Sequence, residues 1–223
     1  MQRLVYAQLL DVIPFKQGFV YSKKDLLSDG NVKVSFLFFN VESNKEVQIS
    51  KNDYLHVKFG NAYRNIVEQL GDFINCDTSF FSNGAVAVAY KTGDFYIFDS
   101  DGALVDNHEL LYQDSPVQSP AVDEKCIWFV VPERNAVISY SPNEQRVLLR
   151  IGGGKSNAFD YPAGVTKILD KLYICNRNSY KIRSIKLEDY SVKDCFTFDE
   201  PVYKYFHIYD KQITVLESGV YSL

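Results

Sequence analysis

The stretch from Ile151 to Phe196, IGGGKSNAFDYPAGVTKILDKLYICNRNSYKIRSIKLEDYSVKDCF, decides the fold. After a Gly-rich loop, two short apolar segments, Val165–Ile168 and Leu172–Cys175, are joined by a polar turn. Two further segments, Lys181–Ile185 and Val192–Phe196, follow in the same way. Short apolar or alternating segments separated by turn residues are typical of strands joined in hairpins. The stretch therefore predicts one four-stranded antiparallel unit.

Looser copies of this unit recur along the chain. The turn of the first hairpin in each copy is marked by Gln17, Asn83, Glu124, Asp170 and Asp210, which are 66, 41, 46 and 40 residues apart. A period of roughly 40–45 residues is typical of the four-stranded blades of a β-propeller. We therefore expect an all-β fold, a single β-propeller domain of about five four-stranded blades over residues 1–223.

The expected blades follow from the repeat. They cover residues 11–50, 74–111, 116–151, 160–198, and 202–223 together with 1–10. The long first interval leaves residues 51–73, which we interpret as a long loop with, at most, a short helix at Tyr63–Leu70. Such loops are often functional. The alternative is six blades, one of them degenerate.

The last unit lacks a fourth strand, whereas a strand-like segment, Arg3–Leu10, precedes the first repeat. We expect this N-terminal strand to pair with the last blade, because ring closure leaves no unpaired edge between the two ends of the chain.

The best-defined unit resembles an NHL-type repeat. The similarity rests on the following residues: Gly153, Gly154, Phe159, Pro162–Val165, Leu172–Ile174, Asn176–Asn178, Lys181 and Ile182. It covers one blade of about 45 residues and departs where the family usually has Asp after the second strand, because Cys175 and Asn176 stand there. More loosely, the layout is similar to bacterial TolB-like propellers. The resemblance implies a propeller that is usually a binding platform and sometimes an enzyme.

Composition narrows the range of partners. The chain has 16 Tyr, 16 Phe and a net charge of −4. This charge gives no reason to expect nucleic-acid binding, which normally uses a basic surface. No apolar run approaches the roughly 20 residues that cross a bilayer, so we expect no membrane insertion.

The four cysteines form no C-x-x-C pair, and three lie in apolar segments, where free Cys behaves as a small buried hydrophobe. This favours a reducing compartment. We therefore expect a cytoplasmic protein, or an exported one if a leader has been removed.

The resemblance implies that the loops between the second and third strands surround one mouth of the central channel. These loops are Lys23–Asp25, Lys91–Gly93, Pro132–Asn135, Asn176–Ser179 and Glu217–Gly219. Arg134 and Arg177 lie in successive blades, where two guanidinium groups could clamp a carboxylate or a phosphate. Alternatively, they are solvated turn residues or ion-pair with Glu133 and Glu217. Asn176, Glu133 and Lys91 complete the candidate binding set on this face.

The segment 51–73 adds Tyr63 and Arg64 as candidate interface residues, since Tyr and Arg often anchor interfaces. No catalytic constellation is recognisable: there is no nucleophile elbow, and the thiols lie in apolar segments. His56, His108 and His207 are too dispersed to predict a zinc site. Asp77, Asp123, Asp170 and Asp210 recur near the first hairpins, but Asp is common in turns. We expect no metal and no cofactor.

These patterns lead to two functional interpretations. The first is a non-catalytic binding module or interaction scaffold whose loop face engages a protein, peptide or glycan. The alternative is a small-molecule enzyme of lactonase or lyase type, with single residues from several blades meeting in the channel. Fold alone does not decide between them.

Overall fold

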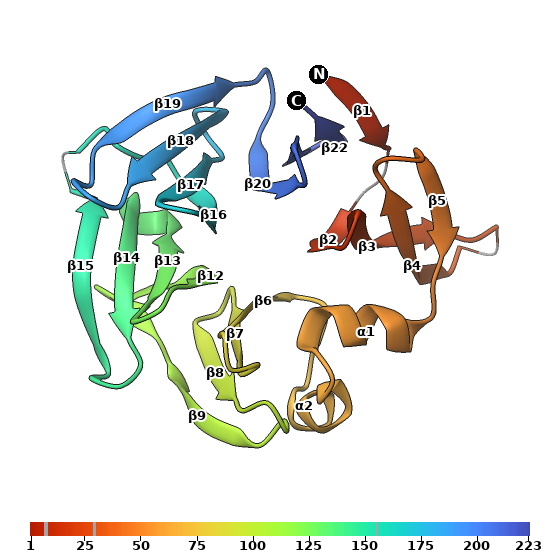
Figure 1. The fold of residues 1–223 in the computed structure, drawn as a ribbon, viewed down its shortest axis with the longest axis horizontal. Helices are drawn as coiled ribbons and strands as arrows, with labels where there is room; N and C mark the ends of the chain where they lie inside the picture. The colour runs from red at the N-terminus through yellow and green to blue at the C-terminus, as the bar shows by residue number, and fades with distance from the viewer. Residues whose placement is uncertain (7–8, 29, 155) are drawn as a thin grey trace.

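A computed structural model describes residues 1–6, 9–28, 30–154 and 156–223. Five four-stranded antiparallel sheets are arranged around a central axis as the blades of a propeller (Figure 1). The five-bladed all-β fold predicted from the repeat is confirmed. From the channel outward, the first blade consists of β2 (Leu9–Phe15), β3 (Gly18–Leu26), β4 (Val32–Asn40) and β5 (Lys45–Gln48), and the second of β6 (Cys76–Phe80), β7 (Val86–Tyr90), β8 (Asp94–Phe98) and β9 (Leu104–Glu109). The third blade consists of β12 (Gln118–Val122), β13 (Ile127–Val131), β14 (Ala136–Ser141) and β15 (Arg146–Gly152), and the fourth of β16 (Pro162–Ile168), β17 (Lys171–Asn176), β18 (Lys181–Lys186) and β19 (Val192–Thr197). The fifth blade consists of β20 (Val202–Ile208), β21 (Lys211–Leu216), β22 (Gly219–Ser222) and β1 (Gln2–Val5).

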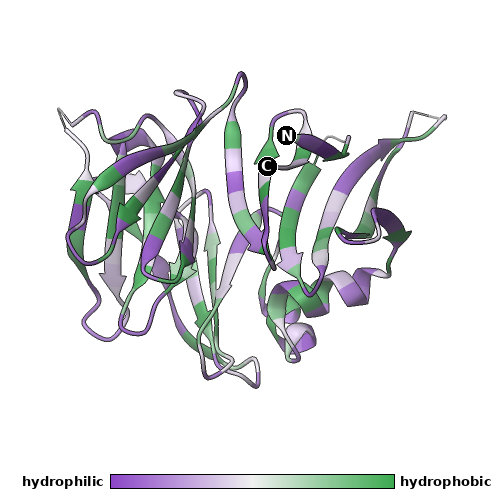
Figure 2. Cartoon of the chain, turned by 45° about the horizontal axis from the view of Figure 1, so that its top comes forward, coloured by the Kyte–Doolittle hydropathy of each residue, from purple (hydrophilic) through white to green (hydrophobic). Residues whose placement is uncertain are grey.

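Each blade is built from local hairpins. Its first two strands are joined at the expected turns, as in β16 and β17, where Ile168 is opposite Lys171. Residues such as Lys16 and Leu169 adopt positive φ angles in these turns. Along the strands, hydrophobic and hydrophilic residues tend to alternate (Figure 2). The middle strands are the most deeply buried; all five residues of β13 are buried, because neighbouring blades cover both of its faces.

The N-terminal strand closes the ring, as predicted. β1 pairs antiparallel with β22, with Gln2 opposite Ser222 and Arg3 opposite Tyr221. This places both chain ends in one blade (Figure 1). The closing strand is shorter than the expected Arg3–Leu10, because Leu9 already belongs to β2 of the first blade.

Gly219 makes this closure possible. Its φ is +149°, and a Cβ atom at this position would lie 2.1 Å from the carbonyl oxygen of Val5. Only glycine accommodates both the backbone conformation and so close an approach of the closing strand.

The segment 51–73 is not the long loop that we expected, since it contains two helices, α1 (Lys51–Phe59) and α2 (Tyr63–Gln69). The short helix foreseen at Tyr63–Leu70 is confirmed, whereas α1 was missed. A capping box starts α1: the Ser50 side chain accepts from the Asp53 amide, and the Asp53 carboxylate accepts from the Ser50 amide.

The two helices fill the space between the first and second blades (Figure 1). Tyr54, Phe59 and Ile66 are buried in one hydrophobic cluster with Val20 of the first blade and Val88 of the second. The helices therefore join these blades as an apolar wedge. This explains the long first interval without a sixth blade.

Two small elements complete the fold. β10 (Leu111–Tyr112) pairs with β11 (Ser115–Pro116) in the connection between the second and third blades. A single 3-10 turn, η1 (Pro132–Arg134), joins β13 to β14. No helix in the described part of the chain is long and apolar enough to cross a membrane.

Candidate functional site: the central channel

The innermost strand of each blade lines the central channel. Cavities open at both ends of this channel, and both are lined in part by Asp11, Val12, Asp77 and Lys204. These charged residues come from β2, β6 and β20, in three different blades. The channel therefore contains a charged cluster, Asp11, Asp77 and Lys204, between its two mouths, and we call this cluster the waist.

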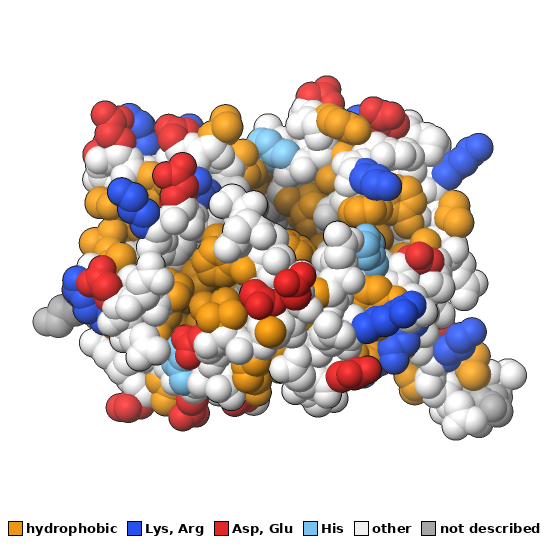
Figure 3. Space-filling model, turned by 60° about the horizontal axis from the view of Figure 1, so that its bottom comes forward, with side chains coloured by type: hydrophobic (Ala, Val, Ile, Leu, Met, Phe, Trp, Pro, Cys, Tyr) orange, Lys and Arg blue, Asp and Glu red, His pale blue; other side chains and the backbone are white. Residues whose placement is uncertain are grey.

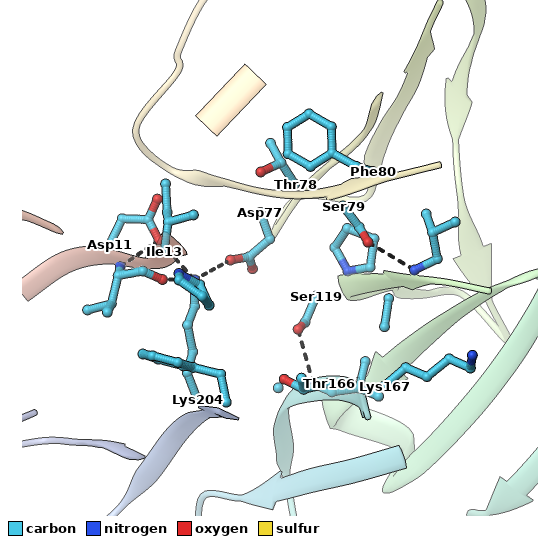
Figure 4. Close-up of a pocket in the computed structure, with 18 of the residues that line it drawn as sticks. Asp11, Ile13, Asp77, Thr78, Ser79, Phe80, Ser119, Thr166, Lys167 and Lys204 are labelled. Carbon is cyan, nitrogen blue, oxygen red and sulfur yellow. Dashed lines mark hydrogen bonds and ion pairs between the residues drawn. The ribbon is translucent and has the colours of Figure 1, made fainter. Parts of the chain in front are cut away.

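Lys204 lies at the centre of this waist. Its ammonium nitrogen is 2.8 Å from Asp11 Oδ1 and 2.9 Å from Asp77 Oδ1, and it donates to the Val12 carbonyl at 3.3 Å (Figure 4). One cation thus connects the fifth blade to the first and the second. The Lys204 side chain remains 31% exposed, whereas that of Asp11 is 5% exposed.

Helix α1 supplies a second cation to Asp11. The Lys58 nitrogen is 2.8 Å from Asp11 Oδ2 and donates to the Ile74 carbonyl at 3.0 Å, while the Tyr54 hydroxyl donates to Asp11 Oδ2 at 2.9 Å. The Lys58 side chain is only 1% exposed. The helix wedge is therefore fixed to the channel wall by a buried ion pair as well as by apolar packing.

The environment of Asp11 determines its charge. Burial alone would raise the pKa of its carboxyl, but the attraction of Lys204 and Lys58 outweighs this effect and holds the pKa well below its usual range. The pKa of Lys204 is raised, because its two carboxylate partners outweigh the opposing effect of burial. Both groups are accordingly ionised at neutral pH.

Two blades approach each other closely beside the waist. A Cβ atom on Gly164 would lie 2.3 Å from the Tyr203 carbonyl oxygen, so glycine lets β16 lie directly against β20. On the other side of β16, the Ser119 hydroxyl accepts from the Val165 amide at 3.1 Å (Figure 4). These contacts make the inner wall continuous.

The hairpin mouth is the cavity at the ends of the inner strands, where the first hairpin of each blade turns. It has a volume of about 450 Å³. Its wall is largely apolar, and hydroxyl groups, two lysines and two aspartates add polar atoms; besides the charged residues named above, the lining includes Ile13, Phe80, Val122, Val165, Thr166 and Lys167. Figure 3 shows hydrophobic side chains gathered in hollows of the surface, with cations and anions interspersed around them.

The loop mouth is the cavity at the opposite end, where the blades are connected, and has a volume of about 430 Å³. Lys91 and Glu217 are exposed at its edge, and Tyr203 forms part of its wall. Both volumes fall within the roughly 300–1,000 Å³ of small-ligand sites. The loop mouth lies on the face to which the sequence assigned the candidate binding residues.

Of those candidates, Lys91 lines the loop mouth directly, and Arg177 lies close to it. The Arg177 guanidinium lies 5.7 Å from the ring centre of Tyr203 and 5.6 Å from that of Tyr161. Both cations are exposed. No carboxylate within the described residues forms an ion pair with either of them.

Asn176 has a different position. It is fully buried, and its side-chain oxygen accepts from the Asp160 amide at 3.1 Å. Asn176 therefore fixes the loop that precedes β16. This loop carries Tyr161, one of the two tyrosines beside Arg177. Its side-chain nitrogen has no hydrogen-bond partner among the described residues.

Arg134 and Glu133 lie together in a separate surface hollow of about 260 Å³, not at the channel. The Ser115 hydroxyl connects them: it accepts from Arg134 Nε at 2.8 Å and donates to Glu133 at 3.3 Å. Arg134 also donates to the Gln113 carbonyl. The structure therefore does not bring Arg134 and Arg177 together into the clamp that was one of the two interpretations of these residues in the sequence.

Tyr63 and Arg64 lie on α2 and contact each other, with Arg64 Nε donating to the Tyr63 hydroxyl at 3.2 Å. Neither residue lines the channel cavities. The expected loop Lys23–Asp25 is also corrected, because these residues belong to strand β3.

The histidines lie outside the channel cavities. His108 and His207 contact tyrosines, Tyr140 and Tyr205, whereas His56 packs edge-on against Tyr63. In the described ranges, no group of three or more His, Cys, Asp or Glu side chains could hold a metal ion.

The charged waist was missed by the sequence reasoning. Asp77 was noted only as one of several recurring Asp residues, and Asp11, Lys58 and Lys204 were not selected. A usable signal was present, since Asp11 and Lys204 each interrupt an apolar inner strand, in LLDVI and VYKYF. Charges inside buried strands are expected to be paired.

Comparison with known proteins supports the fold. No family model matches the chain, and no curated protein matches it. Among solved structures, the chain is similar to virginiamycin B lyase from Staphylococcus aureus, with TM-score 0.56 and 9% identity over 96% of this chain and 79% of that one. It is also similar to Sqt1 from Saccharomyces cerevisiae, with TM-score 0.51 and 11% identity over 95% and 71% of the two chains.

A third similar structure consists of the WD40 repeats of RRP9, with TM-score 0.53 and 12% identity. That match covers 93% of this chain and 57% of the other. At such low identities these similarities show the propeller fold alone. They do not establish the NHL-like or TolB-like repeat type.

Proposed function

We propose that the protein is a non-catalytic interaction module whose loop mouth binds a protein or peptide segment carrying a carboxylate. The observation that carries this proposal is the position of Arg177 beside Tyr161 and Tyr203, at the edge of a cavity that also contains Lys91. Aromatic contacts restrict a guanidinium while leaving its N–H groups available to an anion. Propellers with WD40 repeats are among the similar folds, which agrees with a scaffold role.

The local structure favours recognition without large rearrangement. Tyr161 has a positive φ of 51°, and its amide donates to the Asn135 side chain at 2.7 Å. The Arg177 amide in turn donates to the Tyr161 carbonyl at 3.1 Å. Backbone contacts therefore fix Tyr161 and Arg177 relative to each other before any ligand arrives, which lowers the entropic cost of binding.

The test is differential capture from the native host by cross-linking and mass spectrometry. The double variant Arg177→Ala, Lys91→Ala should lose partners that the wild-type protein captures. The matched control is Arg146→Ala, Lys186→Ala, which removes the same two kinds of charge from exposed ion pairs in other hairpins. The proposal fails if both double variants retain the same partners as the wild type.

A small-molecule enzyme is the second candidate, because the hairpin mouth is an apolar cavity of ligand size with Asp77 and Lys204 in its lining. Asp77 is 24% exposed there. Turnover of a lactone panel by the wild type, lost in Asp77→Asn, would favour an enzyme over the binding module. The similarity to a lyase concerns the fold and supplies no catalytic residue.

A further inference from the structure

The end of the first blade carries a two-stranded ribbon that extends beyond its neighbouring strands. β3 and β4 pair from Gly18 to Leu26, but within the described residues β2 accompanies β3 only as far as Lys23, and β5 accompanies β4 only from Leu37 onward. The ribbon consists of four pairs: Lys23–Ser35, which still lies beside Leu9 of β2, and then Lys24–Val34, Asp25–Lys33 and Leu26–Val32. Figures 1 and 2 show this hairpin projecting from the rest of the blade.

The edge of β4 becomes open because the chain turns away into α1. The last contact on this edge is the Ile49 amide, which donates to the Phe36 carbonyl at 3.0 Å, and Ser50 then caps the helix. Backbone groups of alternate residues point to the same edge of a strand. The N–H and C=O groups of Val34 and Val32 therefore face the same open side as those of Phe36, and no described strand pairs with them there.

One face of the ribbon is mainly apolar along β4. Leu26 is 78% exposed and Val32 is 60% exposed, and the pairing places both on one face with Val34 and with the exposed Lys24 of β3. The same face continues inward to Phe36, whose ring centre lies 4.7 Å from that of Tyr54 in α1. An apolar strip of β4 side chains thus runs from the helix wedge outward along this face, with Lys24 beside it on β3.

The opposite face of the ribbon is polar. Lys23 lies 3.6 Å from Asp25, and Lys33 is opposite Asp25 in the pairing. Two lysines accompany one aspartate on this face, which leaves an excess of positive charge next to the open edge.

We propose that the open edge of β4 is a docking site for an extended peptide segment, which adds to the blade as an antiparallel fifth strand. Unpaired backbone groups at strand spacing select an extended chain, because only a strand satisfies them in series. Residues of the segment opposite Val32 and Val34 would share the apolar face. The residue between them would lie opposite Lys33, so the preferred sequence is apolar–acidic–apolar.

The charge on Lys33 selects against a second copy of this chain. Antiparallel pairing of Val32 and Val34 with the same residues of another copy would place the two Lys33 side chains directly opposite each other. Like charges in such positions are destabilising, and lysine on an edge strand is a known defence against self-association. An acidic residue there turns the same position into an attractive pair.

The probe is the acetylated, amidated peptide Thr-Val-Glu-Val-Thr, compared with its Lys-centred counterpart in NMR titrations. The Glu peptide should shift the amide signals of Val32 and Val34 and slow their hydrogen exchange. In Lys33→Glu the preference should reverse, so that the Lys peptide binds better by up to about fivefold. Equal binding of both peptides, or unmoved Val32 and Val34 signals, would overturn the proposal.

Backbone pairing is tested separately with Val34→Pro, which removes an N–H from the open edge and should abolish binding without lowering the melting temperature. If this variant does not fold, the same point is tested on the wild type with a peptide N-methylated at both valines. This peptide lacks the backbone N–H groups that pairing needs and should not bind. Dimerisation of the wild type through the ribbon, or binding to phosphatidylglycerol vesicles that Val34→Pro retains, would contradict the proposal.

Discussion

Lys204 and Asp11 are separated by 193 positions in the sequence, yet their charged groups lie 2.8 Å apart at the waist of the channel. Their strands belong to the last and the first blade, so this pair spans the junction where the ring closes. Lys58 holds the other oxygen of Asp11 at 2.8 Å. One buried carboxylate thus joins the closing junction to the helix wedge.

Replacing Asp11 with Ala should destabilise the whole domain. The variant leaves the Lys58 ammonium, in a side chain only 1% exposed, without a carboxylate partner. Removing one partner of a buried ion pair costs about 3–5 kcal/mol, which urea unfolding would measure. The control is Glu188→Ala, which breaks an exposed pair with Lys186 and should change stability by less than about 1 kcal/mol. Equal, small effects in both variants would show that the waist has no structural role.

Acid should weaken the fold through the same carboxylate. The folded-state pKa of Asp11 lies below its ordinary value of about 3.9, so the unfolded chain takes up the proton first as pH falls. The stabilisation from Asp11 is therefore complete above roughly pH 5 and declines progressively below about pH 4. The free energy of unfolding, measured by urea titration at a series of pH values from roughly 5 downward, should fall less steeply in Asp11→Asn than in the wild type. An unchanged slope would assign acid sensitivity to other carboxylates.

Ring closure should depend on Gly219. Replacement by Val introduces a Cβ atom 2.1 Å from the Val5 carbonyl oxygen, at a φ of +149°. The closing strand must then detach, and the melting temperature should fall by at least several degrees. Gly71→Val is a matched control, since no atom lies within 4 Å of the place that its Cβ atom would occupy. Deletion of residues 1–5 should reproduce the effect of Gly219→Val, and additivity of the two changes would contradict a shared cause.

The cysteines should differ in reactivity. Cys195 is exposed on the outer strand β19, whereas Cys76 and Cys175 are buried. Burial raises the pKa of the Cys76 thiol to about 11, which further lowers its reactivity at neutral pH. A thiol reagent should therefore label the native protein first at Cys195, and mass spectrometry of the labelled peptides would identify the site. Equally rapid labelling of Cys76 would indicate frequent opening of the second blade.

Local chemistry explains which parts of the fold could be predicted. A turn such as that at Asp170 depends on neighbouring residues, so the hairpins and the blades could be predicted from the sequence. The closure could be predicted because the last blade lacked one strand and the strand at Arg3 had no partner. Helix α1 was missed because its 9 residues form a helix only with the Ser50 cap and the apolar contacts of two blades.

The candidate site was harder to predict, because it joins distant positions. Lys91 lies at one mouth of the channel, on the face that the resemblance to known propellers implied, but no repeat pattern could show that Ser115 engages both Arg134 and Glu133. The charged waist takes single residues from three blades. No spacing within one repeat therefore indicates it.

The pairing of Gln2 with Ser222 also has a consequence for the order of folding. Each blade except the last is made of hairpins that need only nearby residues, so these units can form soon after synthesis. The last blade needs both ends of the chain, and non-local contacts form slowly because loop closure carries an entropic cost. We therefore expect an open ring, complete in four blades, as the final species before the native state.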